Sequence, residues 1–277
     1  MAREHWFFIG GALAVLLPIV LAVAIKKLEL LETRADAREV FSTVGGRKLH
    51  LHIFHAAGAQ KKSPSPALLL FHGGGWRFGS PQQFYPQCQY FAAQGVTCIS
   101  AEYRLGPNHL PDIAGAIEDA ADALAYLHDN AARLAIDTQR LFAGGGSSGG
   151  QLALALGLGL HRNESPRPAG LALYNPVLDL SPCAPANYLA GEGWEAISPQ
   201  HQINGGLPPT LILSGSEDPE VTPKMVSDFC NRAREVGSNC TNIEYAGQYH
   251  GFFNDYEGNT YFEKTNSAVL KFIQDVE

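Results

Sequence analysis

The chain has 277 residues, of which 45% are hydrophobic and 17% charged, and its formal net charge is −7. Basic residues form no cluster larger than a pair, such as Lys26-Lys27 or Lys61-Lys62, so the electrostatic footprint of a nucleic-acid-binding protein is missing. The sequence holds no internal repeat and no long low-complexity tract, and we expect one large globular domain.

An uninterrupted apolar run from Trp6 to Ile25 stands between Arg3 and Lys26-Lys27. The run is long enough to span a bilayer and is long for the core of a signal peptide. Ala22-Val23-Ala24 is a small-x-small cleavage site, whereas the basic pair after the run favours retention on the cytoplasmic side.

We expect residues 1–27 to be a signal peptide or an N-terminal membrane anchor, with membrane association through residues 6–25. The folded domain, residues 28–277, is then exported to the periplasm or beyond, or held outside the membrane by the anchor. An anchor whose domain faces the cytoplasm is the remaining alternative.

The five cysteines include no CxxC pair and no Cys/His metal spacing. In an exported domain, Cys88 with Cys98 and Cys230 with Cys240 are candidates for local disulfides. Buried free thiols are the alternative.

Strands and helices alternate along the chain. Residues Val40 to Phe54 predict a hairpin that turns at Gly45-Gly46, with His50 and His52 on its solvent face. The further predicted strands are Ala67–Phe71, Val96–Tyr103, Gly170–Asn175, Thr210–Gly215 and Cys240–Tyr245, and the predicted helices are Pro81–Gln94, Asp112–Ala132, Thr222–Val236 and Phe262–Val276. This order indicates a mostly parallel sheet covered by helices on both faces. Along Asp112–Ala132 an apolar stripe faces the core, and Asp119, Asp122 and Asp129 lie elsewhere.

The stretch from Arg140 to Leu158, RLFAGGGSSGGQLALALGL, predicts a strand, a sharp turn and a helix with a serine at the turn. In this G-x-S-x-G arrangement any residue but glycine two positions from the serine clashes with a neighbouring element. The helix that follows directs backbone N–H groups toward a developing oxyanion. The stretch lacks the Lys-Ser/Thr ending of a phosphate-binding loop.

Two serines fit this pattern: Ser147 between Gly145 and Gly149, or Ser148 between Gly146 and Gly150. We favour Ser147, because it leaves a further small residue in the first helical turn and makes Ser148 the donor of the next backbone N–H.

A second glycine-rich turn, His72-Gly73-Gly74-Gly75-Trp76, follows the buried strand Ala67–Phe71. The bare backbone of a glycine triplet lets N–H groups approach a ligand oxygen closely. We expect His72 to hold this loop by hydrogen bonds rather than to act as a base.

A serine nucleophile needs a base that takes its proton and an acid that orients the base. The loop after Thr210–Gly215 carries Asp218, and the loop after Cys240–Tyr245 carries His250. These are the favoured acid and base, with Glu217 and Asp179 as alternative acids. His161 and His201 are not favoured as the base, because they lie in connecting segments that precede the favoured acid in the chain.

Together, His72 to Trp76, Glu102-Tyr103-Arg104, Gly145 to Gly150, Asp218 and His250-Gly251-Phe252 resemble the hormone-sensitive-lipase-like group of the α/β-hydrolase superfamily, with its bacterial acetyl esterases and carboxylesterases. The resemblance covers about Val40 to Val276. It implies hydrolysis of carboxylic esters with short acyl chains, without a metal or an organic cofactor. It also implies a Ser147, Asp218 and His250 triad, with an oxyanion hole made by the N–H groups of Gly74, Gly75 and Ser148.

The chain departs from the family pattern in two places. Gly146 and Ser148 flank the serine where the commoner family form has Asp and Ala. The connector before the first strand is too short for the helical cap of many relatives. We expect the insert at residues 176–209, with Tyr188, to serve as a small lid, and Trp76, Trp194 and Phe252 to line the substrate pocket. Because this cap is missing, we expect the acyl pocket to be open on that side, which suits a small ester or an acylated carbohydrate.

Three other functions stay open. A peptidase of the same superfamily would cleave amides, and a membrane-associated lipase would prefer long acyl chains. A catalytically silent binding module would leave the triad unexplained.

Overall fold

The computed structural model describes residues 34–59, 63–106, 110–161, 166–185 and 191–276. The chain divides into two compact units, Met1–Ala35 and Asp36–Glu277, and the strands and helices below belong to the second. The apolar run at residues 6–25 lies outside the described residues. Within the described ranges, no helix combines the length and the apolar character needed to cross a membrane.

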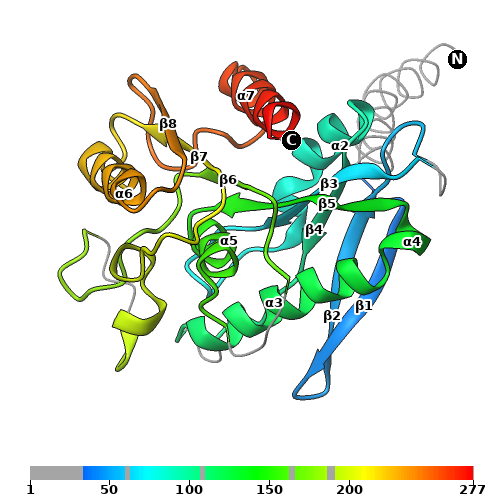
Figure 1. Cartoon of the computed structure of the whole chain (residues 1–277), viewed down its shortest axis with the longest axis horizontal. Helices are drawn as coiled ribbons and strands as arrows, with labels where there is room; N and C mark the ends of the chain where they lie inside the picture. Colours follow the sequence, from blue (N-terminus) through cyan, green and yellow to red (C-terminus); the bar gives the residue numbers. More distant parts are fainter. Residues whose placement is uncertain (1–33, 60–62, 107–109, 162–165, 186–190, 277) are drawn as a thin grey trace, which may run out of the picture. The chain divides into compact units, whose positions relative to one another are not determined.

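Eight strands form one sheet in the order β1-β2-β4-β3-β5-β6-β7-β8 (Figure 1). β1 pairs with β2 and β2 with β4 in antiparallel fashion, and every later neighbour pair is parallel. The strands are β1 (Ala37–Val44), β2 (Arg47–Phe54), β3 (Ser65–Phe71), β4 (Thr97–Ala101), β5 (Ile136–Gly146), β6 (Leu171–Tyr174), β7 (Thr210–Gly215) and β8 (Cys240–Tyr245). The predicted mostly parallel sheet is confirmed.

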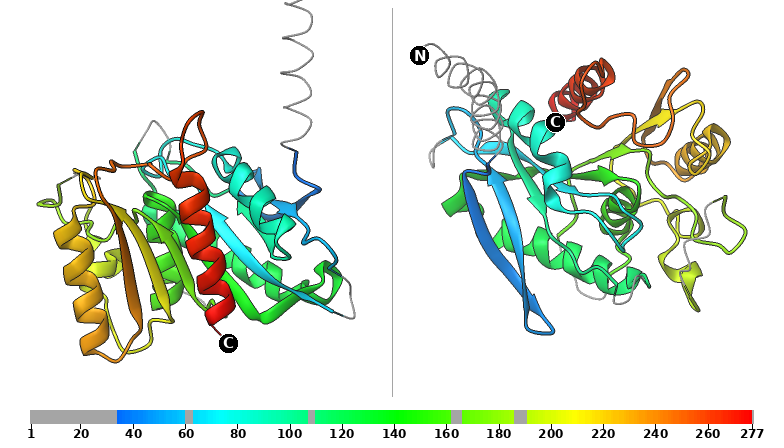
Figure 2. Two further views of the ribbon diagram at one scale, coloured as in Figure 1. Left: turned by 90° about the horizontal axis from the view of Figure 1, so that it is seen from above. Right: turned by 180° about the vertical axis from the view of Figure 1, so that it is seen from behind.

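Helices cover both faces of this sheet. α2 (Tyr85–Ala93) and α7 (Tyr261–Asp275) lie together on one face, and α3 (Ile113–Asp129) and α5 (Ser148–Leu158) on the other, as Figures 1 and 2 show. α6 (Pro223–Glu235) packs beside β7 and β8. The described residues also form short helices: η1 (Pro81–Phe84), α4 (Ala131–Leu134), η3 (Trp194–Ile197) and η4 (Pro199–His201).

The predicted hairpin is confirmed, but one of its histidines is not on a solvent face. Gly45 and Gly46 turn the chain with φ of 56° and 82°. His52 is buried, because α2 covers this side of β2 and brings the Tyr85 hydroxyl to 2.6 Å from His52 Nδ1. His52 Nε2 also lies 3.3 Å from Glu102 Oε1. The expectation of a wet histidine face was therefore wrong for His52.

A buried ion pair corrects the expectation for Asp119, which does not lie away from the core. Its side chain has no exposed surface, and Arg104 Nη2 donates to its Oδ1 at 2.6 Å. The Arg104 backbone N–H and Nε donate to Oδ2 at 2.7 and 2.9 Å. The carboxylate therefore ties the segment after β4 to α3.

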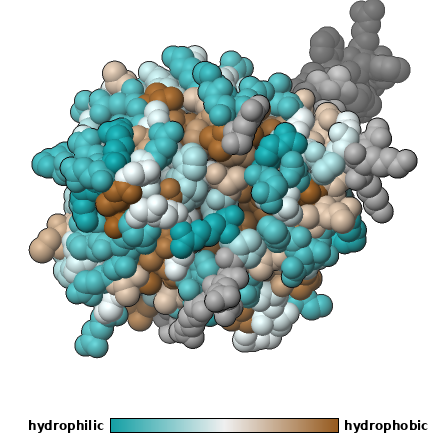
Figure 3. Space-filling model, in the orientation of Figure 1, coloured by the Kyte–Doolittle hydropathy of each residue, from teal (hydrophilic) through white to brown (hydrophobic). Residues whose placement is uncertain are grey.

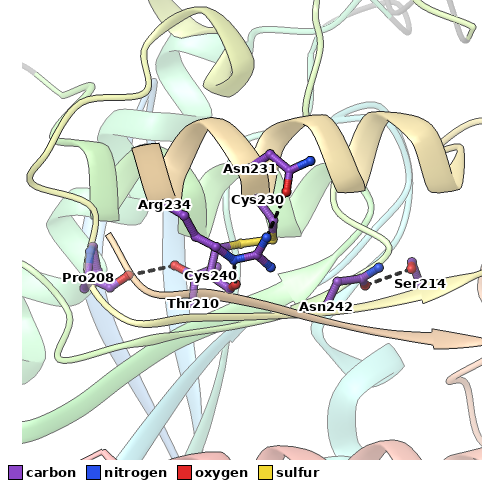
Figure 4. The surroundings of a disulfide bond; sticks show 8 residues. All are labelled: Pro208, Thr210, Ser214, Cys230, Asn231, Arg234, Cys240 and Asn242. Carbon is purple, nitrogen blue, oxygen red and sulfur yellow. Dashed lines mark hydrogen bonds between the residues drawn. A yellow bond between two sulfur atoms is a disulfide. The ribbon is translucent and has the colours of Figure 1, made fainter. Parts of the chain in front are cut away.

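Both candidate cysteine pairs form disulfides, so the free-thiol alternative is wrong for these four residues. Cys88 of α2 is bonded to Cys98 of β4, and Cys230 of α6 to Cys240 of β8. Figure 4 shows the second bridge, beside which Arg234 Nε donates to the Cys240 carbonyl at 2.9 Å. Cys183 is a free, exposed thiol.

Most of the face in Figure 3 is hydrophilic, with brown patches scattered over it. The apolar core instead fills the layers between the sheet and its helices, where β3 is apolar on both faces as predicted. This packing holds the carboxyl ends of β3, β5, β6, β7 and β8 at one edge of the sheet, where loops carry the residues of interest.

Candidate active site

The sharp turn between β5 and α5 places Ser147 in a backbone conformation that few non-glycine residues adopt, with φ of 53° and ψ of −117°. The glycines around it are required sterically. A Cβ on Gly145 would lie 2.5 Å from the Phe71 carbonyl oxygen, and one on Gly149 would overlap the carbonyls of Phe71 and His72. The close packing predicted for the Ser147 frame is therefore present.

Three predicted residues converge at the edge of the sheet, from the loops that follow β5, β7 and β8. Ser147 Oγ lies 2.9 Å from His250 Nε2, and His250 Nδ1 lies 2.8 Å from Asp218 Oδ2. With the Nδ1 proton donated to the carboxylate, Nε2 is free to accept the serine proton. This is the arrangement that activates a serine hydroxyl as a nucleophile.

Asp218 is held as a buried carboxylate. Its side chain has no exposed surface, and Oδ1 accepts hydrogen bonds of 2.9 Å from the N–H groups of Glu220 and Val221. The alternative acids face elsewhere: Ser216 Oγ donates to the Glu217 carboxylate, and Asp179 accepts from the Ser181 N–H at 2.8 Å. Among the three candidates, the structure brings only Asp218 to His250.

Ser148 takes a different position from Ser147. It opens α5, it is fully buried, and its Oγ accepts a hydrogen bond of 3.0 Å from the Gly75 N–H. Its hydroxyl therefore binds the glycine-rich loop, whereas the Ser147 hydroxyl binds His250. The geometry favours the Ser147 register.

The glycine-rich loop after β3 runs beside Ser147. Gly74 and Gly75 have φ of 122° and 62°, and a Cβ on Gly74 would overlap the Phe78 carbonyl. Within the described residues, the N–H groups of Gly74 and Ser148 make no hydrogen bond, so both remain available to a substrate oxygen. The Gly75 N–H, expected to act with them, is bound to Ser148.

His72 holds the loop from beneath, as predicted. Its Nδ1 lies 2.8 Å from the Gly73 carbonyl oxygen, and its ring stacks on Tyr103 with centroids 4.3 Å apart. Burial lowers the pKa of His72 to about 4, opposed by this backbone hydrogen bond. A neutral imidazole that donates to the loop is a structural support.

Two residues that the sequence reasoning missed connect this loop to the histidine loop. Gln83 accepts from the Gly73 N–H at 2.7 Å and donates to Asn254 Oδ1 at 3.0 Å. Asn254 in turn donates to the Gly251 carbonyl at 2.7 Å. No local pattern marks Gln83 or Asn254, because their partners are remote in sequence.

Asn175, also missed, lies immediately after β6, between the strands that lead to Ser147 and Asp218. Its φ is 36°, its Nδ2 lies 3.4 Å from His250 Nε2, and its Oδ1 accepts from the Gly251 N–H at 3.2 Å. A polar residue directly after a buried parallel strand is the signal that marks it.

A cavity of about 350 Å³ opens at Ser147 and His250. The other lining residues are Gly73, Gly74, Gly75, Arg77, Phe78, Gln83, Asn175, Glu220, Gly251, Phe253 and Asn254. Polar side chains therefore make up much of the wall around the serine.

None of the three predicted pocket aromatics is among these lining residues. Trp76 is fully buried in the core, and Phe252 packs against Tyr245 at a centroid distance of 5.1 Å. Trp194 packs against His201 at 4.9 Å. Phe253, the neighbour of Phe252, lines the cavity instead, because the chain after Gly251 turns Phe252 toward α7.

The insert expected to serve as a lid is described at residues 176–185 and 191–209, and these parts do not lie at the cavity. They contribute no lining residue to the cavity, and the Ile197 carbonyl accepts from Gln151 Nε2 of α5 at 3.0 Å. Tyr188 lies outside the described residues. The described insert therefore packs on the scaffold rather than over the serine.

Comparison with known proteins identifies the family of the chain. A family model described as alpha/beta hydrolase fold matches residues 68–200. Esterase 2 of Thermogutta terrifontis is 33% identical, and the match covers 87% of this chain and 94% of that chain with a TM-score of 0.80. Structures of that esterase include propionate-bound, butyrate-bound and paraoxon-phosphorylated forms. The chain belongs to the α/β-hydrolase family, in its hormone-sensitive-lipase-like group.

Two of the curated relatives are ester hydrolases as well. Esterase LipC of Mycobacterium tuberculosis is 27% identical over 68% of this chain and 53% of its own length. Ethyl acetate hydrolase of Pseudomonas putida is 32% identical over 60% of this chain and 54% of its own length. The chain thus spans about half the length of these two relatives.

Proposed function

We propose that this protein is a serine hydrolase of carboxylic esters, with Ser147 as nucleophile, His250 as base and Asp218 as the orienting acid. One observation carries the proposal: His250 lies 2.9 Å from the Ser147 hydroxyl and 2.8 Å from the Asp218 carboxylate, on three loops of an esterase fold. The esterase relatives support the same reaction class.

The proposed reaction has two halves. Ser147 Oγ attacks the ester carbonyl while its proton passes to His250 Nε2, and the resulting oxyanion accepts hydrogen bonds from the Gly74 and Ser148 N–H groups. The Gly75 N–H becomes a third donor once it turns from Ser148 Oγ to the oxyanion. His250 then protonates the departing alcohol, and water hydrolyses the acyl-enzyme in the same manner.

The substrate we propose is an ester with a short acyl chain, including acetyl groups on carbohydrates. A cavity of about 350 Å³ suits a small acyl group, and Gln83, Asn175 and Asn254 offer polar contacts to an alcohol rich in hydroxyls. The propionate-bound and butyrate-bound relative and the ethyl acetate hydrolase support a short acyl chain.

We propose further that the catalytic domain works in an oxidising compartment, exported or anchored at the outer side of a membrane. The two disulfides support this placement, since such bonds persist outside the reducing cytosol. The apolar run at residues 6–25 supplies the targeting signal.

Labelling of the purified protein with a fluorophosphonate, followed by mass mapping of the modified peptide, tests the mechanism. We expect modification at Ser147, lost in Ser147→Ala and strongly slowed in His250→Ala. Labelling at Ser148 would show that Ser148, rather than Ser147, is the nucleophile. Folded protein that takes up no label would favour the silent binding module.

Substrate preference separates the remaining alternatives. We expect 4-nitrophenyl acetate and butyrate to be cleaved with higher kcat/KM than 4-nitrophenyl palmitate, and acetate to be released from acetylated xylan. A preference for palmitate would favour the lipase, and faster cleavage of peptide anilides than of esters would favour the peptidase. Cleavage of aryl acetates without release from acetylated glycans would remove the carbohydrate substrate.

A further inference from the structure

We propose that Arg77 makes the catalytic cavity selective for esters that also bear a carboxylate, an inference that rests on the esterase function proposed above. Arg77 lines the same cavity as Ser147 and His250. Neither the catalytic steps nor the oxyanion hole uses its side chain.

The backbone fixes where this cation lies. The N–H groups of Arg77 and Phe78 donate to the Gly74 carbonyl at 3.2 and 3.1 Å, which closes a tight turn after the glycine triplet. The guanidinium then lies along Gly75, since a Cβ on Gly75 would be 3.5 Å from Arg77 Nη2 and 3.7 Å from Nε. The positive charge is thus next to the loop over which the substrate carbonyl is expected to lie.

Most other arginines of the described chain have an acidic or carbonyl partner. The ion pairs are Arg38 with Glu102, Arg104 with Asp119, Arg133 with Glu39 and Arg140 with Asp137, and the carbonyl contacts are those of Arg167, Arg232 and Arg234. Arg34 and Arg47 have no such partner among the described residues and are exposed to solvent.

Arg77 differs from all of these, because its Nε is buried and has no hydrogen-bond partner within the described residues. Buried donors are nearly always satisfied in folded proteins, and an unsatisfied one is costly. Once the side chain turns Nε toward the cavity, a ligand oxygen there would supply the acceptor that the protein does not.

The shape of the guanidinium defines the ligand. Its carbon lies 6.0 Å from the centroid of the Phe78 ring. Guanidinium groups stack on aromatic faces and direct their donors outward in the plane, where a carboxylate binds in bidentate fashion. The chemistry of this wall therefore fits a carboxylate of the substrate.

A negative side chain also lines the cavity. Glu220 is one of its lining residues, and its Oε2 lies 3.9 Å from His250 Nε2. An anionic ester would therefore be repelled near His250 and attracted near Gly75, which orients it. Since the whole chain carries a net charge of −7, long-range attraction of anions is absent, and selectivity depends on contact with Arg77.

Two matched ester pairs test the proposal and locate the anion. 4-Acetoxybenzoate and its methyl ester share the acetyl group and differ in charge on the alcohol side. Mono-4-nitrophenyl glutarate and 4-nitrophenyl pentanoate differ in charge on the acyl side. The measured quantity is the ratio of kcat/KM for the anionic ester to that for the neutral ester, in the native protein, Arg77→Lys and Arg77→Gln.

In the native protein we expect a ratio of about ten or more for at least one pair, as a charge-assisted bidentate contact provides. The ratio should fall below one in Arg77→Gln and be partly kept in Arg77→Lys, which retains the charge but not the fork. Lys48→Gln, which removes an exposed cation on β2, should leave the ratio as in the native protein.

Two results would overturn the proposal: a native ratio of one or less for both pairs, or an equal loss on both members of each pair in Arg77→Gln, which would mark Arg77 as a structural support. Failure of the esterase function itself looks different, because the native protein would then cleave none of the four esters.

Discussion

The Gly75 N–H donates a hydrogen bond of 3.0 Å to the Ser148 hydroxyl oxygen. This contact joins the loop after β3 to the first residue of α5, where the commoner family form has an alanine that offers no such acceptor. One proposed oxyanion donor is therefore held by the protein's own side chain until a substrate oxygen replaces it.

Replacing Ser148 separates the contribution of its side chain, which binds the Gly75 N–H, from that of its backbone N–H, a proposed oxyanion donor. We expect Ser148→Ala to lower the free energy of unfolding by about 1 kcal/mol, since a buried hydrogen bond is lost. Its kcat should stay within about tenfold of native, because the proposed oxyanion donors are backbone N–H groups that the substitution keeps. Urea unfolding measures the free energy of unfolding, and hydrolysis of 4-nitrophenyl acetate measures kcat. An inactive Ser148→Ala beside an active Ser147→Ala would show that Ser148 is the nucleophile.

The Gln83 side chain bridges the glycine-rich loop and Asn254. Its removal should therefore disturb the position of the loop's backbone N–H donors more than the binding of substrate. We expect Gln83→Ala to lower kcat by about tenfold or more with a smaller change in KM, because a displaced donor loses transition-state contacts. Gln82→Ala, at the exposed neighbouring position, is the matched control. Loss of stability in Gln83→Ala with unchanged kcat would limit Gln83 to a structural role.

Burial of His72 predicts a pH dependence of stability. Its folded-state pKa of about 4 lies below the ordinary histidine value of 6.5, so between these two pH values the unfolded chain binds a proton that the folded chain does not. The stabilisation is present above pH 6.5 and is lost as the pH falls toward 4. Between pH 7 and pH 5 we expect this residue to remove about 2 kcal/mol from the free energy of unfolding.

Urea unfolding at the two pH values, in the native protein and in His72→Phe, measures the contribution of His72. The variant should lose less stability on acidification, while His55→Gln, at an exposed position, should behave as the native protein does. An identical pH dependence in His72→Phe would contradict the burial argument.

The Cys230–Cys240 disulfide ties α6 to β8, and β8 leads into the His250 loop (Figure 4). With a sequence separation of 10, its loss should lower the free energy of unfolding by about 2–3 kcal/mol on the chain-entropy account. The double variant Cys230→Ser/Cys240→Ser tests this by urea unfolding. Cys183→Ser is the control, because that thiol is free and exposed. Alkylation of more than one cysteine in the unreduced, denatured protein would argue against the bridges.

The local patterns of the sequence were sufficient for the scaffold. β7 and β8 have the expected bounds, because short apolar runs between turn residues leave little freedom in register. The Ser147 turn was also predictable, since its glycines are required by contacts with β3 that any such turn makes. Burial of His52 and Asp119 was not, because alternation along one element does not show which other element covers it.

The sequence by itself determined the fold and the Ser147 turn, because both depend on patterns of residues that are close together in the chain. It also determined the order of Ser147, Asp218 and His250, because that order can be read directly along the chain. Only the tertiary structure decided that Ser148 holds Gly75, that Gln83 and Asn254 connect two loops, and that Arg77 rather than Trp76 lines the cavity. These contacts join residues far apart in the chain, and the way a side chain points at a turn depends on backbone angles that sequence patterns do not record.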